Sequence, residues 1–283
     1  MPPRTTGLSM KLDKALEIAL ATDSGRVRNH NEDSVAGDAS LGLVVLADGM
    51  GGYHAGEVAS AVAVTRIFQE ARDGLKTLVP GQVDHVSGLH YESLILSDAI
   101  RLANEEVYEL ATQRKEYRGM GTTIVVALFF DNQLTCAHAG DSRMYAYSEG
   151  NLERLTEDHS VVREFINTGM YSEDEARATF NPSLVTRALG ADKELQVEIQ
   201  EKKVTPGEVY MVCSDGLTNM LGDDRIREVL GSPLDLEACA RELVEQANKS
   251  GGEDNISIAL IRVVSEYKAE EDWQTKMIHW FNR

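Results

Sequence analysis

The chain has 283 residues, 42% of them hydrophobic, and a formal net charge of −18 from 46 acidic and 28 basic residues. This balance argues against binding to nucleic acids, because contact with a phosphate backbone depends on clustered Lys and Arg. No apolar run approaches the about 18 residues that cross a bilayer, and residues 1–9 lack the apolar core of a secretion signal. We therefore expect a cytoplasmic protein without a transmembrane segment. The three scattered cysteines predict buried, reduced thiols.

Strand and helix patterns alternate in the first half of the chain. After a leader expected over residues 1–14, residues 16–22 alternate as a strand does, and residues 43–47 form a short apolar run typical of a buried strand. Apolar residues then recur at helical spacing over residues 61–71 and 96–110, which predicts two amphipathic helices. A charged loop at residues 23–33 joins the first two strands.

The second half begins with strands predicted at residues 122–130, 133–139 and 143–147, joined by turns short enough to require antiparallel pairing. An irregular segment, residues 156–190, follows with short helical pieces. Regular patterns then return as strands at 195–204, 208–213 and 256–264 and as a helix at 236–247. Helices and strands come in blocks, which favours a layered α+β domain over a βαβ repeat.

The last residues, 265–283, form a separate question. Trp273, Met277, Trp280 and Phe281 fall on one helical face. Such a tail either docks on a partner or a membrane surface or folds back over its own domain. We expect a domain over residues 15–264, followed by this amphipathic tail.

Carboxylates recur where apolar runs end. Asp48 and Gly49 follow one run, and the same pattern returns at Asp141, Asp215 and Asp254. A single Asp-Gly step is usually a hairpin turn, but the repetition predicts that these side chains converge. Several carboxylates in one place require cations or protons, since two charges about 4 Å apart repel by roughly 4 kcal/mol at an effective dielectric of 20. A donor set made only of oxygen favours Mg²⁺ or Mn²⁺ over zinc.

Two such ions would lower the pKa of a shared water and neutralise a transferring phosphoryl group, so a phosphate ester is the expected substrate. Arg28 is a candidate to bind its oxygens, because a guanidinium grips phosphate with two parallel hydrogen bonds. An ordinary surface arginine is the alternative. A cysteine-based phosphatase is disfavoured, because Cys136 and Cys213 lack an arginine loop at the required spacing.

Six short motifs occur in one order along the chain: Val27-Arg28 with Asn31-Glu32-Asp33, Ala47 to Gly52, Gly119 to Thr123, Gly140 to Arg143, Ser214-Asp215-Gly216, and Asp254-Asn255. Together they resemble the metal-dependent protein phosphatases of the protein phosphatase 2C type, over about residues 16 to 264. The resemblance implies a central sandwich of two antiparallel sheets flanked by helix pairs (α-β-β-α layers). It also implies hydrolysis of phosphoserine and phosphothreonine in proteins by a water or hydroxide held between two Mn²⁺ or Mg²⁺ ions.

The resemblance also implies roles for individual residues. Asp48 would bridge the two ions, the Gly49 carbonyl would bind one, and Asp215 and Asp254 would bind the other. Asp141 would serve a third, weaker ion, Glu32 and Asp33 would hold waters on the metals, and Arg28 would bind the substrate phosphate. Residues 156–190 would form a mobile flap that influences substrate choice. Bacterial members commonly oppose Ser/Thr kinases in signal transduction, which implies phosphorylated protein substrates as partners.

One position departs from the family. Many members have a histidine, proposed as the general acid, where this chain has Met50, and a thioether cannot donate a proton. Bacterial members often have it at the position of Tyr53, whereas here the imidazole stands at His54. His54 or Tyr53 could assist the leaving group, or water could suffice. A catalytically silent relative that uses the fold as a binding module is the alternative function. The oligomeric state is not indicated.

Overall fold

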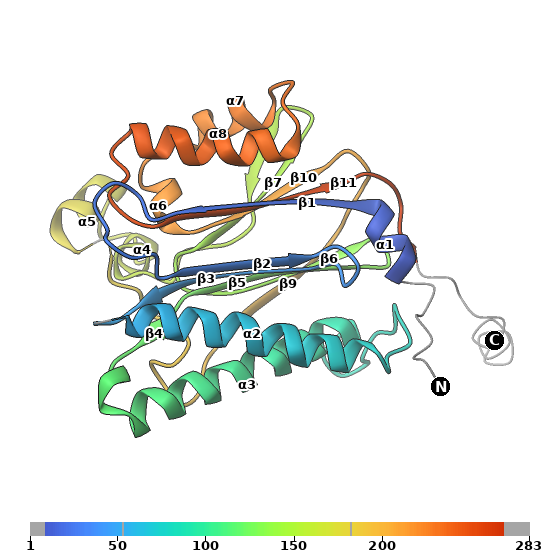
Figure 1. The fold of residues 1–283 in the computed structure, drawn as a ribbon, viewed down its shortest axis with the longest axis horizontal. Coiled ribbons are helices and arrows are strands. Elements are labelled where there is room, and N and C mark those ends of the chain that lie inside the picture. Colours follow the sequence, from blue (N-terminus) through green and yellow to red (C-terminus); the bar gives the residue numbers. More distant parts are fainter. Residues whose placement is uncertain (1–8, 53, 182, 269–283) are drawn as a thin grey trace, which may run out of the picture.

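The computed structural model describes residues 9–52, 54–181 and 183–268. Its centre is a sandwich of two antiparallel sheets (Figure 1). One sheet has the order β1 (Leu16–Asp23), β11 (Ile256–Val263), β10 (Val209–Cys213), β7 (Arg143–Ser148) and β8 (Asn151–Arg154). The other has the order β2 (Asp33–Asp38), β3 (Leu43–Met50), β5 (Ile124–Phe130), β6 (Gln133–Ala139) and β9 (Glu198–Lys203), with β4 (Gly121–Thr122) paired to β3.

Helices cover the outer face of each sheet (Figure 1). The sheet that contains β3 is covered by α2 (Ala55–Leu75) and α3 (Tyr91–Gln113), which η1 (Lys115–Tyr117) follows. The sheet that contains β10 is covered by α6 (Asp215–Thr218), α7 (Asp223–Leu230) and α8 (Leu236–Lys249). At one end of the sandwich lie α4 (Val161–Asn167) and α5 (Glu173–Thr179), and α1 (Ser9–Ala15) lies at the other. The predicted α-β-β-α fold class is confirmed.

Three apolar clusters hold the layers together. Between the sheets, Phe129 and Tyr210 meet edge to face with ring centroids 5.5 Å apart. Leu96 and Ile100 of α3 are fully buried below the β3 sheet, and Leu243 of α8 is fully buried above the β10 sheet. Burying a side chain of this size contributes about 1.5–3 kcal/mol. The central strands are therefore fixed on both faces, and so are the positions of their ends.

Local sequence accounts for the strands that were predicted correctly. Every residue of β5 is buried, because helices cover one face of its sheet and the second sheet covers the other. Asp131 and Asn132 adopt φ of 42° and 56° and join β5 to β6 as the predicted two-residue hairpin.

One strand connection differs from the expectation. The sequence predicts antiparallel pairing of the strands on either side of residues 140–142, but β6 and β7 belong to different sheets. Gly140, with φ of 112°, turns the chain from one sheet to the other. The strands on either side of Pro206 and Gly207 are separated in the same way, because β9 pairs with β6 and β10 pairs with β7 and β11. Strands β2 and β8 and helix α7 were not predicted.

The cysteines and the ends of the domain also have defined places. Cys136, Cys213 and Cys239 are buried and free, as predicted. Leu12 in α1 and Tyr267 are packed into the core between the sheets, with 4% and 2% of their surface exposed. The domain thus extends beyond the expected limits of 15 and 264, and the apolar tail residues 273–281 lie outside the described residues. No described helix has the length and apolar character needed to traverse a bilayer.

Leu12 provides a test of this boundary. We expect Leu12→Ala to lower the free energy of unfolding by about 2–3 kcal/mol, because it leaves a cavity in the central cluster. Lys14→Ala, on the exposed side of the same helix, is the matched control and should change it by less than about 0.5 kcal/mol. Urea unfolding of both variants measures the difference. Equal stability of the two would mean that residues 9–14 are a loose leader.

Candidate metal centre

The predicted acidic residues lie at one end of the sandwich, near α4 and α5 (Figure 1). The Asp48 carboxylate is repelled by four others, those of Asp33, Asp215, Asp141 and Asp254. They come from the start of β2, the turns after β6 and β10, and the turn before β11. The structure therefore brings together aspartates that are far apart in the chain. All five are partly buried, which leaves a path from solvent.

Strand pairing imposes the closest approach. Asp33 and Asp48 are directly opposite each other on the antiparallel strands β2 and β3, where like charges destabilise a sheet. Both carboxylate oxygens of Asp33 are buried and have no hydrogen-bond partner among the described residues. Burial, together with repulsion by Asp215 and Asp254, raises the pKa of Asp33 to about 7, although the nearby Ser257 and Ser214 hydroxyls act to lower it.

The other aspartates show the same perturbation. Burial first and the neighbouring aspartates second raise the pKa of Asp48 well above its ordinary value, and that of Asp141 to about 7. Burial and Asp254 also raise the pKa of Asp215. Clustered buried carboxylates, one of them without a hydrogen-bond partner, and an all-oxygen donor set are what Mg²⁺ or Mn²⁺ needs. The residues present therefore fit such ions.

Gly49 lies where two backbone segments meet. A Cβ at this position would come within 2.1 Å of the Gly56 carbonyl oxygen and 2.5 Å of the Glu32 carbonyl oxygen. The Gly49 amide donates a hydrogen bond of 3.1 Å to the same Glu32 oxygen. Only glycine fits, and its position ties the corner after Asp48 to the loop that carries Glu32 and Asp33.

Asn255 positions this loop, a role the sequence did not reveal although it contained the Asp254-Asn255 pair. Its side chain accepts a hydrogen bond from the Glu32 amide (2.8 Å) and donates to the carbonyls of Ser24 (3.1 Å) and His30 (2.9 Å). It is 6% exposed. The residue after Asp254 thus holds residues 24–32 against the start of β11.

Arg28 and His54 lie in one pocket of about 360 Å³ beside the acidic cluster, together with Glu32 and His30. The Arg28 guanidinium donates to the Asp254 carboxylate at 2.8 Å, and its side chain is 54% exposed. His54 precedes α2 with φ of 62°, and its ring lies 4.3 Å from that of His30. Both predicted residues are thus solvent-accessible and close to the carboxylates. Tyr53 lies outside the described residues.

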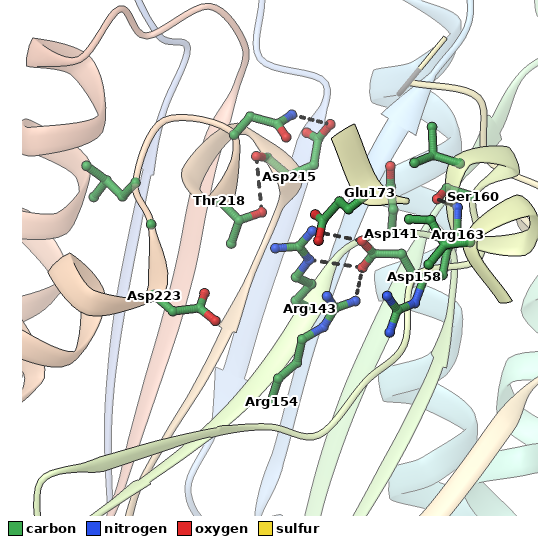
Figure 2. Close-up of a pocket in the computed structure, with 15 residues that line it drawn as sticks. Asp141, Arg143, Arg154, Asp158, Ser160, Arg163, Glu173, Asp215, Thr218 and Asp223 are labelled. Carbon is green, nitrogen blue, oxygen red and sulfur yellow. Dashed lines mark hydrogen bonds and ion pairs between the residues drawn. The ribbon is translucent and has the colours of Figure 1, made fainter. Parts of the chain in front are cut away.

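A second pocket, of about 380 Å³, joins the acidic cluster to the 156–190 segment (Figure 2). Asp141 and Asp215 line it, and Asp158 forms its far wall. Arg143 donates two hydrogen bonds to Asp158, at 2.9 and 2.8 Å, and Arg154 also binds this carboxylate. These paired charges fix the start of the 156–190 segment to β7 and β8. In the sequence Arg143 was only part of a motif, and this link was not predicted.

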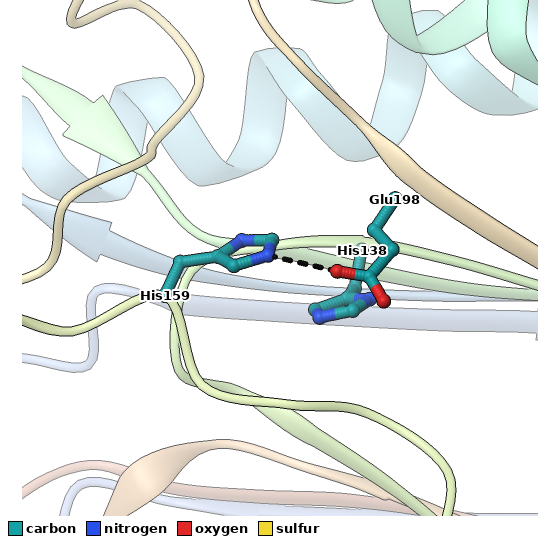
Figure 3. Close-up of side chains that lie close together, drawn as sticks. All are labelled: His138, His159 and Glu198. Atoms are coloured by element: carbon teal, nitrogen blue, oxygen red, sulfur yellow. Dashed lines mark hydrogen bonds and ion pairs between the residues drawn. The ribbon is translucent and has the colours of Figure 1, made fainter. Parts of the chain in front are cut away.

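His138, His159 and Glu198 form another compact cluster, with potential ligand atoms all within 4.8 Å (Figure 3). The two rings are stacked, with centroids 4.6 Å apart and planes 11° from parallel, so their in-plane lone pairs do not converge on one ion. His159 Nδ1 accepts from the Gly140 amide (3.2 Å), which places its proton on Nε2, 3.3 Å from Glu198. The cluster therefore suits a hydrogen-bonded link between β6, β9 and the 156–190 segment better than a metal site.

Comparison with known proteins agrees with this geometry. The family model described as Protein phosphatase 2C matches residues 25–260. Protein phosphatase PhpP of Streptococcus pneumoniae is 35% identical over 259 residues, which cover 89% of this chain and 99% of the relative. The chain therefore belongs to the protein phosphatase 2C family.

Solved structures give the same result. The Mycobacterium tuberculosis serine/threonine phosphatase PstP/Ppp is 33% identical with a TM-score of 0.78, covering 88% of this chain and 99% of that one. The catalytic domain of the serine/threonine phosphatase PstP in complex with two manganese ions is 33% identical with a TM-score of 0.76, covering 89% and 99%.

The raised pKa values predict how the metal-free protein responds to pH. A carboxyl whose pKa is raised on folding binds more protons in the native state, so its contribution to stability is present at low pH and lost as pH rises. In EDTA, we expect the free energy of unfolding to fall by about 2 kcal/mol or more between pH 5 and pH 7.5, the window set by Asp33 and Asp141 near 7. Added Mn²⁺ should remove this fall, because the ion replaces the protons.

Urea unfolding at the two pH values, with EDTA or with Mn²⁺, measures this effect. Asp33→Asn removes one of the carboxyls with a raised pKa and should reduce the fall in the free energy of unfolding. A metal-free protein that is equally stable at both pH values would contradict the repulsion among these aspartates.

Proposed function

We propose that this chain is a metal-dependent protein phosphatase that removes phosphate from phosphoserine and phosphothreonine with two Mn²⁺ or Mg²⁺ ions. The observation that carries this proposal is the convergence of five aspartates around Asp48, the unpartnered Asp33 among them, in a chain of the protein phosphatase 2C family. The manganese complex of PstP supports the choice of ion.

The chain's residues have distinct tasks in this proposal. Asp48, the Gly49 carbonyl, Asp215 and Asp254 hold two ions, and Asp141 holds a third, weaker one. Bound ions of this kind lower the pKa of water and offset the charge of the phosphoryl group. Glu32 and Asp33 accept hydrogen bonds from water at the same corner, and their fixed positions limit where that water can lie.

Arg28 binds the phosphate of the substrate. Its exposed guanidinium faces the pocket, and its contact with Asp254 holds it beside the acidic cluster. Such a fork can donate two hydrogen bonds to phosphate oxygens. Because Arg28 shares Asp254 with the ions, phosphate and metal binding are expected to affect each other.

His54 is the proposed proton donor for the leaving alkoxide. The thioether of Met50 has no proton to give, and His54 lies in the same pocket as Arg28. Its Nδ1 is 3.3 Å from Glu57, which leaves Nε2 as the nitrogen that can turn towards a substrate.

The biological setting follows from the family and from the 156–190 segment. We propose a bacterial signalling enzyme of the cytoplasm that opposes a Ser/Thr kinase. The 156–190 segment acts as a flap, since Asp158, Arg163 and Glu173 line the pocket that reaches Asp215. A catalytically silent binding module is disfavoured, because every matched carboxylate is present. Hydrolysis of a phosphothreonine peptide with Mn²⁺, lost on chelation, distinguishes the two functions.

Asp215→Asn tests the metal site. We expect kcat to fall by at least about 100-fold, because a charged oxygen ligand is removed, while urea unfolding shows an intact fold. Asp224→Asn, an exposed residue of α7 paired only with Arg227 among the described residues, is the control and should retain activity. Near-normal turnover by a folded Asp215→Asn protein would remove this residue from the site.

Arg28→Ala tests phosphate binding. We expect KM for a phosphopeptide to rise by about tenfold, with a smaller change in kcat, and Arg28→Lys to recover only part of the loss because it lacks the fork. Manganese affinity is measured separately by calorimetry, because the variant also removes the ion-pair partner of Asp254, a proposed metal ligand. An unchanged KM would rule out the proposed role.

A further inference from the structure

A third cavity, of about 780 Å³, is lined by Met50, two residues along the chain from Asp48. It lies between the end of α3 and the loop at Gly190 and Ala191. We call it the basic groove, because the charged residues that line it are Arg114, Lys115 and Arg118. Its wall contains no Asp or Glu among the described residues, whereas five carboxylates line the pocket in Figure 2.

The three cations of the basic groove are available to a ligand. All three are exposed, and none forms an ion pair with a described residue. The Arg114 guanidinium lies 5.8 Å from the centre of the Tyr117 ring, a contact that leaves its donors in solvent. Other described arginines with close acidic neighbours are paired, such as Arg101 with Glu105 at 2.7 Å. In a chain of net charge −18, a groove lined by three unpaired cations is unexpected and calls for an explanation.

Helix stabilisation does not supply that explanation. Basic residues often lie in the last turn of a helix, where they interact with its negative end. The last turn of α3 has none, and the helix end accounts for only one of the three cations, the extended C-cap residue Arg114. Lys115 and Arg118 lie beyond the helix end, in η1 and the residue after it.

The groove begins at the catalytic corner. Met50 is the last residue of β3, two residues after Asp48, which corresponds to about 7 Å along a strand. Gly121 pairs with Met50, and a Cβ on Gly121 would lie 3.6 Å from the Met50 side chain. A peptide whose phosphorylated residue is at Asp48 therefore brings residues two to four positions away into the groove, at about 3.3–3.6 Å per residue.

We infer that the basic groove binds acidic or further phosphorylated residues that flank the target residue of a phosphoprotein substrate. This inference rests on the proposed function and adds a preference in substrate sequence. Charge complementarity selects this occupant, because the groove has three cations and no carboxylate among the described residues of its lining, whereas the pocket in Figure 2 has five carboxylates beside three arginines. The two surfaces together orient a substrate whose charge is unevenly distributed.

The test compares three substrates in the presence of Mn²⁺: p-nitrophenyl phosphate, a phosphothreonine peptide with neutral neighbours, and the same peptide with Asp or a second phosphothreonine two to four residues away. We expect kcat/KM of the acidic peptide to exceed that of the neutral one by about tenfold at low salt, and this advantage to shrink as salt rises. In the triple variant Arg114→Gln, Lys115→Gln, Arg118→Gln, the advantage should disappear while the other two substrates change less than about twofold.

Two further variants sharpen the result. Lys76→Gln, Arg241→Gln, Lys249→Gln removes three exposed cations elsewhere and should retain the preference. Replacing the three groove cations by Glu should transfer the preference to a peptide with Lys at the flanking positions. Equal use of acidic and neutral peptides by the wild type, or a parallel loss on all three substrates in the triple variant, would overturn the inference.

Binding separates this inference from the proposed function. Fluorescence anisotropy measures binding of the same peptides to the groove, whether or not they are hydrolysed. If no substrate is hydrolysed, the phosphatase assignment alone is overturned. Retention of the acidic preference in binding, and its loss in the triple variant, would then still support the groove. Sedimentation with phosphatidylserine vesicles that depends on the three cations, without any peptide preference, would assign the groove to a membrane surface and overturn the inference.

Discussion

Electrostatic repulsion among the aspartates around Asp48 is the constraint on which the site depends. Asp33 and Asp48 are forced opposite each other by strand pairing, and neither oxygen of Asp33 finds a partner among the described residues. This arrangement costs stability, and the apolar layers of the sandwich offset the cost. Because β3 and β10 are buried on both faces, their ends cannot separate to relieve the repulsion. Divalent ions are the natural counter-charge.

The antiparallel register of the buried strands determines where the carboxylates of the site lie. A shift of one residue in β2 or β3 would turn Asp33 or Asp48 away from the site and expose apolar residues. Gly49 prevents a different adjustment, since its contacts with the Gly56 and Glu32 carbonyls leave no space for a side chain. Asn255 extends the same rigidity to the loop that carries Arg28. The loops of the site are thus held by hydrogen bonds to strand ends, not by their own structure.

These features explain what the sequence could and could not predict. The apolar run of β5 and the repeated carboxylate at strand ends are local patterns, so the central strands and the acidic residues were predictable. Strand β2 was missed because Asp33–Asp38 contains two aspartates and a glycine and is only partly buried. The change of sheet at Gly140 was missed because a turn has the same local sequence whether its strands pair or separate. The role of Asn255 depends on contacts about 225 residues away in sequence, which no local pattern contains.

The charge of the surface around Met50 differs from one region to the next. On one side the Asp141 and Asp215 pocket is lined by five carboxylates and three arginines, and two of these, Arg143 and Arg154, both pair with Asp158. On the other side the basic groove has cations without counter-ions among the described residues. In the proposed mechanism a substrate phosphate is drawn to bound metals and Arg28, but that attraction is the same for every phosphoester. Discrimination between phosphoproteins must come from the flanking residues, and an uneven distribution of charge around the corner distinguishes the two orientations of a charged peptide.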